Sequence, residues 1–150
     1  MAVQFIVDYV VALAGLGVGG VAGFLLAHGA GRAPAWDARV TLPLVLAAGA
    51  AHLALIPVVE TQRQLMFGLY FLAMTAVFAA GLIGLTAWRA GAILFPAGSI
   101  VAYFYFAFIA HQADVVGLIV KAVEVAVITT AVIGFAINRG GAAEAKRSPA

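Results

Sequence analysis

Long apolar runs are the feature that most constrains how this chain can fold. Each extends for roughly 20 residues or more, enough to cross about 30 Å of bilayer hydrocarbon as an α-helix. Only 9% of the residues are charged, against about 25% in a soluble domain. Too little polar surface remains to cover a water-soluble globule. The sequence therefore predicts an all-α integral membrane protein.

The apolar runs are separated by charges, glycine and proline, which divide the chain into a bundle of five transmembrane helices. We place these spans at residues 3–30, 40–59, 65–88, 91–110 and 115–138. Because the link at residues 111–114 is very short, a bundle of four helices is the alternative. The first run is not expected to be a cleaved signal peptide, because it is too long, contains Asp8 and lacks a basic start. Residues 1–139 then form a single transmembrane domain, and residues 140–150 a short polar tail.

Positive charges are distributed unequally between the two sides that five spans create. One side carries Arg32, Arg39, Arg89, Arg139, Lys146 and Arg147, and the other carries Arg63. We expect the protein to lie in the plasma membrane. Since cytoplasmic loops are enriched in Lys and Arg, we expect its N-terminus outside the cell and its C-terminus in the cytoplasm. Trp36 and Trp88 then fall at the inner interface, where aromatic belts lie.

Small residues form stripes on two of the expected helices. Stripes at this spacing let helix backbones approach closely. We expect packing inside the bundle, with self-association as the alternative. The stripes consist of Gly15, Gly19 and Gly23 in the first span and of Ala76, Ala80 and Gly84 in the third.

Aromatic residues dominate the stretch YFYFAF at positions 103–108. They point to all faces of the fourth helix, which favours packing and anchoring. A stacking site for a flat ligand is the alternative.

Ionisable residues gather in the outer half of the expected bundle. This polar cluster consists of Asp8, His52, Glu60, His111, Asp114, Lys121 and Glu124. Asp114, Lys121 and Glu124 share one face of the fifth helix. The face should point into the bundle, because a charge at a helix centre costs roughly 2.5–3.5 kcal/mol in lipid. Lys121 and Glu124 are one turn apart and can form a pair. This pair is either a functional site or a neutralised structural pair that fixes which way the helix is rotated in the bundle.

The residue types in the polar cluster allow some kinds of chemistry and disfavour others. His52, Glu60, His111 and Asp114 are acceptable ligands for copper, zinc or iron, although their spacing is not diagnostic. The histidines lie at unequal depths, which suits a bis-histidine haem poorly. The sequence shows no nucleophile with its base and no phosphate loop, so we expect no catalysis. Outside the tail there is no cluster of Lys and Arg residues, so we do not expect the protein to bind nucleic acid.

The sequence contains four short motifs, namely Ala51-His52-Leu53, Pro57 followed by Glu60, GLYFLA at 68–73, and Lys121-Ala122-Val123-Glu124-Val125. Together they resemble the motifs of a loose family of small uncharacterised bacterial multi-pass membrane proteins. Val58 and Val59 stand where that family often has polar residues. The resemblance groups His52 and Glu60 with Lys121 and Glu124, but it implies no activity.

Three functions are consistent with this pattern. The leading hypothesis is a non-catalytic accessory, assembly or stabilising subunit, whose partners are the lipid bilayer and other membrane subunits or a second copy. The first alternative is binding of a metal ion or redox cofactor by the polar cluster. The second is a small ion or solute carrier.

Overall fold

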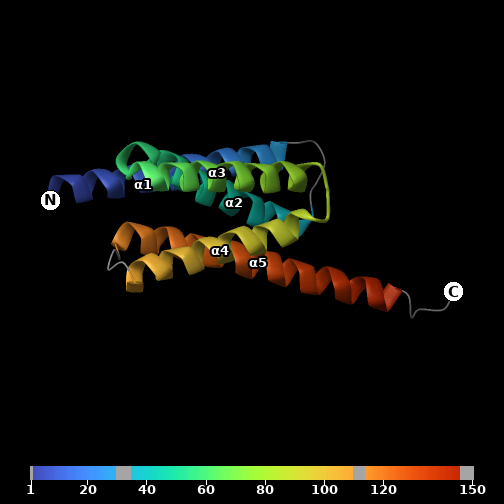
Figure 1. Ribbon diagram of the computed structural model, residues 1–150. Helices are drawn as coiled ribbons and strands as arrows, with labels where there is room; N and C mark the ends of the chain where they lie inside the picture. Colours follow the sequence, from blue (N-terminus) through green and yellow to red (C-terminus); the bar gives the residue numbers. More distant parts are fainter. Residues whose placement is uncertain (1, 30–34, 110–113, 146–150) are drawn as a thin grey trace.

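The computed structural model describes residues 2–29, 35–109 and 114–145, and the regular structure in these ranges is entirely helical (Figure 1). The elements are α1 (Ala2–Gly29), α2 (Trp36–Leu55), a 3-10 turn η1 (Ile56–Val58), α3 (Thr61–Leu82), α4 (Trp88–Ile109) and α5 (Val115–Ala145). Within the described ranges, five helical segments are long and apolar enough to cross a membrane. This confirms the prediction of five candidate spans and gives the chain the architecture of a multi-pass membrane protein.

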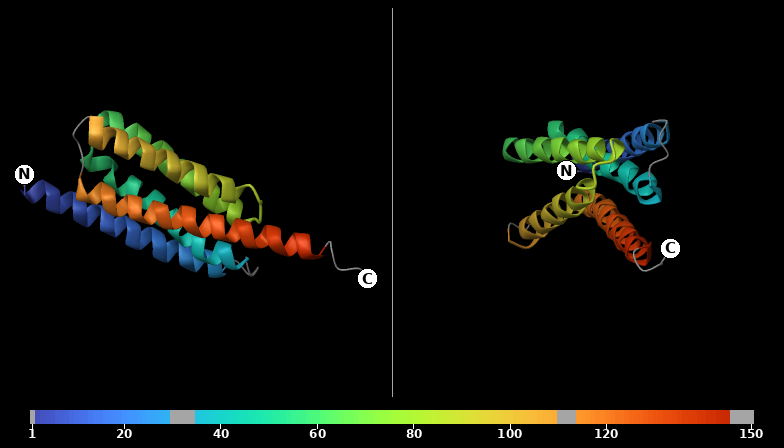
Figure 2. Two further views of the ribbon diagram at one scale, coloured as in Figure 1. Left: turned by 90° about the horizontal axis from the view of Figure 1, so that it is seen from below. Right: turned by 90° about the vertical axis from the view of Figure 1, so that its right-hand side faces the viewer.

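The helices run up and down between two ends of the bundle (Figure 1). The N-terminal end holds the start of α1, the α2–α3 connection and the start of α5, whereas the C-terminal end holds the α3–α4 turn and the end of α5. Helix α2 is central, because it packs against α1, α3 and α5. The end-on view in Figure 2 shows the α4–α5 hairpin set at an angle to the layer formed by α1, α2 and α3.

A tight turn between α3 and α4 moves two predicted boundaries. Helix α3 ends at Leu82, and Gly84 adopts a φ of 80°, which is accessible to glycine but costly for other residues. The Leu85 N–H donates to the Ala80 carbonyl at 2.9 Å, and the Gly84 N–H to the Gly81 carbonyl at 3.2 Å. These two bonds form a Schellman motif, which satisfies the last carbonyls of the helix. The predicted span 65–88 is therefore wrong at its end, and residue 88 begins the next helix.

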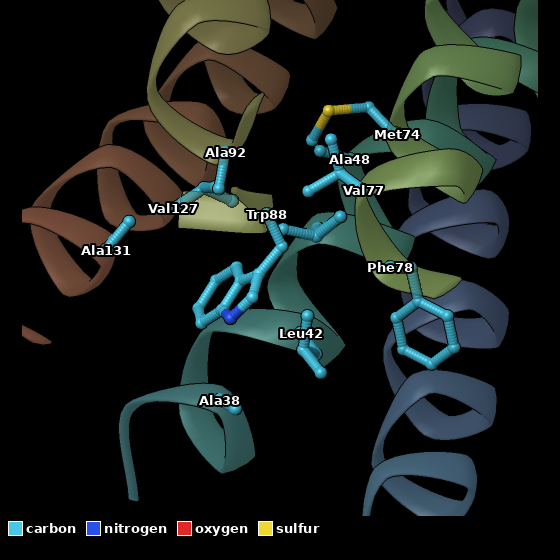
Figure 3. Packing of buried hydrophobic residues seen from close by; sticks show 11 residues of the cluster. Ala38, Leu42, Ala48, Met74, Val77, Phe78, Trp88, Ala92, Val127 and Ala131 are labelled. Carbon is cyan, nitrogen blue, oxygen red and sulfur yellow. The ribbon is translucent and has the colours of Figure 1, made fainter. Parts of the chain in front are cut away.

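Trp88 lies inside the bundle, which corrects its predicted place in an interfacial belt. Its side chain is 3% exposed and belongs to a core at the C-terminal end of the bundle (Figure 3). Trp36, by contrast, is 46% exposed at the start of α2. The core draws its side chains from four helices: Ala38, Leu42, Val45 and Ala48 of α2, Met74, Val77 and Phe78 of α3, Trp88 and Ala92 of α4, and Val127 and Ala131 of α5.

The glycine stripe of α1 packs directly against the backbone of α2. A Cβ at Gly15 would lie 2.7 Å from the Ala50 carbonyl oxygen, and one at Gly23 would lie 2.8 Å from the Pro43 Cα. At Gly19 it would lie 2.6 Å from the Leu46 carbonyl oxygen. In lipid, van der Waals contact of this kind holds helices together, because the surrounding tails are as apolar as the side chains.

The predicted small-residue stripe of α3 needs correction. Ala76 is exposed, Gly84 lies in the turn after the helix, and Ala80 packs half-buried against the core. The buried face of α3 is set instead by Met74, Val77, Phe78 and Gly81. At Gly81 an added Cβ would collide with the Leu42 side chain of α2. The close approach therefore occurs one residue beyond Ala80, on a different face from the predicted stripe.

Candidate functional site

A cavity of about 590 Å³ lies toward the N-terminal end of the bundle, and residues of all five long helices line it. Its polar lining consists of Asp8, His52, Glu60, Arg63, Tyr70, Ser99, Tyr103, Asp114 and Lys121. Its walls are mainly apolar and include Leu55, Val58, Met66, Phe67, Ala102, Phe106, Val116 and Val120. A largely apolar cavity with a few converging polar groups is the usual form of a small-molecule site.

Most of the polar cluster predicted from the sequence meets at this cavity. Asp8, His52, Glu60, Asp114 and Lys121 line it. Glu124 is fully buried and hydrogen-bonds to Lys121, so it lies just behind the lining. His111 lies outside the described residues.

Lys121 forms part of the cavity floor, and its partner Glu124 lies directly behind it. Lys121 Nζ donates to Glu124 Oε2 at 2.7 Å and to Ser99 Oγ at 2.5 Å. Lys121 is 8% exposed and Glu124 is fully buried. The ion pair neutralises both charges within one turn of α5, and the Ser99 contact ties that turn to α4.

His52 completes the floor from the α2 side. Its Nδ1 bonds to the Ala48 carbonyl oxygen at 2.9 Å, and because a carbonyl only accepts, Nδ1 carries the hydrogen. The Nε2 atom lies 3.7 Å from Glu124 Oε1. The ring packs between Phe67 and Tyr70, with centroid separations of 4.9 and 4.1 Å. His52 is thus held in one tautomer and one orientation when it is neutral.

Two polar atoms near the floor are buried without a hydrogen bond to any described residue. They are the Tyr70 hydroxyl and Glu124 Oε1. Buried polar atoms are nearly always satisfied in folded proteins, and here the Tyr70 hydroxyl lies next to the Glu124 carboxylate and is the donor placed to satisfy it.

The rim of the cavity is built around the start of α5. Asp114 Oδ1 accepts a hydrogen bond from the Gly117 N–H at 2.5 Å, which caps the helix. The Tyr103 hydroxyl donates to the Asp114 carbonyl at 2.7 Å, and its ring occupies the space that a Cβ at Gly117 would need. Across the rim, the Arg63 guanidinium lies 5.4 Å from the centroid of the Phe106 ring.

The aromatic stretch of α4 divides between the cavity and the outside of the bundle. Tyr103 and Phe106 line the cavity, whereas Phe104, Tyr105 and Phe108 are exposed. This division agrees with the expectation that the stretch points to several faces of its helix.

The predicted metal ligands are not brought together. In the described ranges, no three residues of the types His, Cys, Asp and Glu are grouped as metal ligands. The physical reason is that His52 lies at the floor, with Nδ1 bonded to its own helix, while Asp114 caps α5 at the rim. The fourth predicted ligand, His111, lies outside the described residues.

Sequence reasoning missed two polar residues of the site. It did not consider Ser99 or Tyr70 as partners of the polar cluster. Ser99 does interrupt an otherwise apolar run, and a hydroxyl at that depth could have been matched to Lys121.

It also missed an ion pair at the other end of the bundle. Arg89 Nε bonds to the fully buried Asp37 Oδ2 at 2.7 Å, and Gly134 of α5 leaves room for the Asp37 side chain. The sequence pattern places Arg89 in a loop and Asp37 outside the second span, so it does not predict that the two meet.

A comparison of the chain with models of known protein families gave no match, and neither did comparisons with curated proteins and with solved structures. The function is therefore inferred from the geometry of the cavity.

Proposed function

We propose that this chain is a non-catalytic multi-pass membrane protein that binds a small amphipathic molecule in the cavity. The observation that supports this most strongly is the convergence of polar side chains from all five long helices on one space of about 590 Å³. Cavities that hold small molecules typically measure about 300–1,000 Å³ and combine apolar walls with a few polar contacts. The walls accept the apolar body of the ligand, and the floor accepts its polar head.

The cavity has a polar mouth and a filled base. Glu60 and Asp114 at the rim are exposed, whereas the helices beyond Glu124 meet in the core that includes Leu42, Met74 and Val127. A carrier or channel needs a polar route through both halves of the membrane. A site open at one end therefore favours binding over conduction.

We further propose that the mouth faces the outside of the plasma membrane. The supporting observation is the charge bias in the sequence, in which Arg63, at the start of α3, is the one Lys or Arg on the mouth side and six Lys and Arg residues belong to the other side. Of those six, Arg39, Arg89 and Arg139 are in the described ranges, the first two near helix starts at the C-terminal end of the bundle and Arg139 in the last part of α5. This orientation places the C-terminus in the cytoplasm.

The hypothesis of an accessory or assembly subunit remains a prediction that is compatible with ligand binding. Gentle detergent extraction followed by co-purification tests it directly. Recovery of the chain alone, folded and with its ligand, would favour an independent binding protein.

Native mass spectrometry of the gently extracted protein tests the binding function. We expect an added mass on the parent chain and its loss in Ala102→Phe, because the larger side chain fills space that Ala102 leaves in the cavity wall. Ala122→Phe is the matched control, since Ala122 is exposed on α5 and does not line the cavity. Equal added mass in both variants, or none on the parent, would contradict the proposal.

A further inference from the structure

The cavity floor presents a hydrogen-bond acceptor to which no described residue donates. Because Nδ1 of His52 carries the hydrogen in its bond to Ala48, Nε2 of the neutral ring is an acceptor. It lies 3.7 Å from Glu124 Oε1, which is buried behind the lining. His52 Nε2 is therefore the floor acceptor that a ligand can reach, and an acceptor in such a place calls for a donor.

The neighbouring donors do not supply this need. Lys121 Nζ is directed to Glu124 Oε2 and Ser99 Oγ. The Tyr70 hydroxyl lies next to the Glu124 carboxylate, and it has one hydrogen to donate. With that hydrogen directed to Glu124, His52 Nε2 is left to accept from a ligand.

The charges around the cavity indicate the sign of that group. The carboxylates at the lining and floor are Asp8, Glu60, Asp114 and Glu124, and the cations are Arg63 and Lys121. Among the described residues the carboxylates outnumber the cations, so this part of the chain gives the cavity a net negative charge. Such a charge inside low-dielectric walls attracts a cation.

The aromatic walls are also suited to a cation with an apolar body. Phe67, Tyr70, Tyr103 and Phe106 line the space between the rim and the floor. Arg63 already lies over the Phe106 ring, which shows that the wall accepts a positive group on an aromatic face.

We propose that the cavity binds an organic ammonium ion, namely a protonated primary amine attached to an apolar or aromatic body. An N–H group of the ammonium donates to His52 Nε2, the carboxylates around the cavity balance its charge, and its body lies against the aromatic walls. This inference rests on the proposed binding function of the same cavity and adds the chemical class of the ligand.

Calorimetric titration of the purified full chain in detergent with four related compounds tests the proposal. The compounds are 2-phenylethylamine, 2-phenylethanol, 3-phenylpropionate and trimethyl(2-phenylethyl)ammonium, which share an aromatic body and differ in charge and in N–H donors. We expect the primary amine to bind at least about tenfold more tightly than the alcohol and the acid. The quaternary ammonium should bind more weakly than the amine, because it keeps the charge but lacks the donors.

Variants of the floor and the rim separate the contacts that matter. We expect Glu124→Gln and His52→Phe each to weaken amine binding by roughly tenfold, whereas Glu60→Gln, the same charge change at the exposed rim, weakens it by less than about threefold. His52→Phe keeps an aromatic ring against Phe67 and Tyr70, so it remains informative if Glu124→Gln does not fold.

The possible failures are distinguishable. If the alcohol or the acid binds as tightly as the amine and Ala102→Phe abolishes that binding, the ammonium inference is overturned and the binding function stands. If none of the four compounds binds, the ammonium inference is overturned. If native mass spectrometry also shows no added mass, the binding function fails with it.

Discussion

At the scale of single residues, the Lys121–Glu124 pair explains how two charges are accommodated inside an apolar helix. Each charge would be costly if it faced lipid, but the two lie 2.7 Å apart and Ser99 adds a second contact to the lysine. The pair therefore fixes which face of α5 points into the bundle. It also leaves Glu124 Oε1 directed toward His52.

Removing one partner of this pair should cost stability. We expect Glu124→Leu to lower the free energy of unfolding by about 3–5 kcal/mol, because it leaves Lys121 buried without its counter-charge. Glu124→Gln keeps an oxygen that can accept from Lys121 and should cost less. Thermal melts in detergent measure both, with the exposed Glu60→Leu as a control expected within about 0.5 kcal/mol of the parent. A Glu124→Leu variant as stable as the parent would rule out this role.

The Asp37–Arg89 pair should behave as a second coupled unit at the other end of the bundle. Arg89→Met leaves the fully buried Asp37 without the guanidinium 2.7 Å away, and we expect a loss of about 3–5 kcal/mol. The double variant Asp37→Leu/Arg89→Met should lose clearly less than the sum of the two single variants. Denaturant titrations of the four proteins measure the coupling, and simple additivity would show that the pair does not act as a unit.

At the scale of the elements, α1 is held to the bundle by close backbone contact with α2. Ala12, Gly15, Gly19, Gly23 and Ala27 are its buried small residues, while the larger side chains Val18, Val21 and Leu25 are exposed. Packing between small residues thus replaces the interlocking of large side chains that forms the core of α2 to α5.

Neighbouring glycines on α1 should respond oppositely to the same substitution. Gly19→Ala places a Cβ 2.6 Å from the Leu46 carbonyl oxygen and should lower stability by about 1–3 kcal/mol. Gly17→Ala is the matched control, because its Cβ would meet nothing within 4 Å and alanine favours the helix by about 1 kcal/mol. Equal melting temperatures for the two variants would contradict the assigned α1–α2 contact.

The sequence was informative about properties that belong to one helix at a time. Apolar length predicted the candidate spans, and helical phase placed Asp114, Lys121 and Glu124 on one face of α5. It could not reveal which faces of different helices meet, because that depends on packing across the bundle. The contacts of Gly81 with Leu42 and of Arg89 with Asp37 are examples, because each joins two different helices. The position of Trp88 in α4, instead of at the end of α3, follows from the turn at Gly84, whose positive φ is a property of the folded backbone.

At the scale of the whole molecule, the bundle is filled at one end and hollow toward the other. The core around Leu42, Met74 and Trp88 closes the C-terminal half, whereas the cavity lies above Lys121 and Glu124. The positions of the ionisable residues along their helices predicted that the polar cluster lies in one half of the bundle. The cavity also depends on side chains such as Tyr70, Ser99 and Phe106, whose proximity cannot be predicted from their spacing in the sequence. The cavity at the N-terminal end offers space for a ligand, and the packed core at the C-terminal end closes the bottom of that cavity.

Site-specific labelling from outside the cell tests the central claim of a cavity that opens to the outer side. The chain has no cysteine, so single substitutions report without interference. We expect a membrane-impermeant maleimide to label Ala102→Cys in the cavity wall and not Ala122→Cys on the exposed face of α5, which lipid covers in the proposed arrangement. Labelling of Ala102→Cys only after the inner side is made accessible would reverse the orientation. No labelling of Ala102→Cys from either side would contradict the open cavity itself.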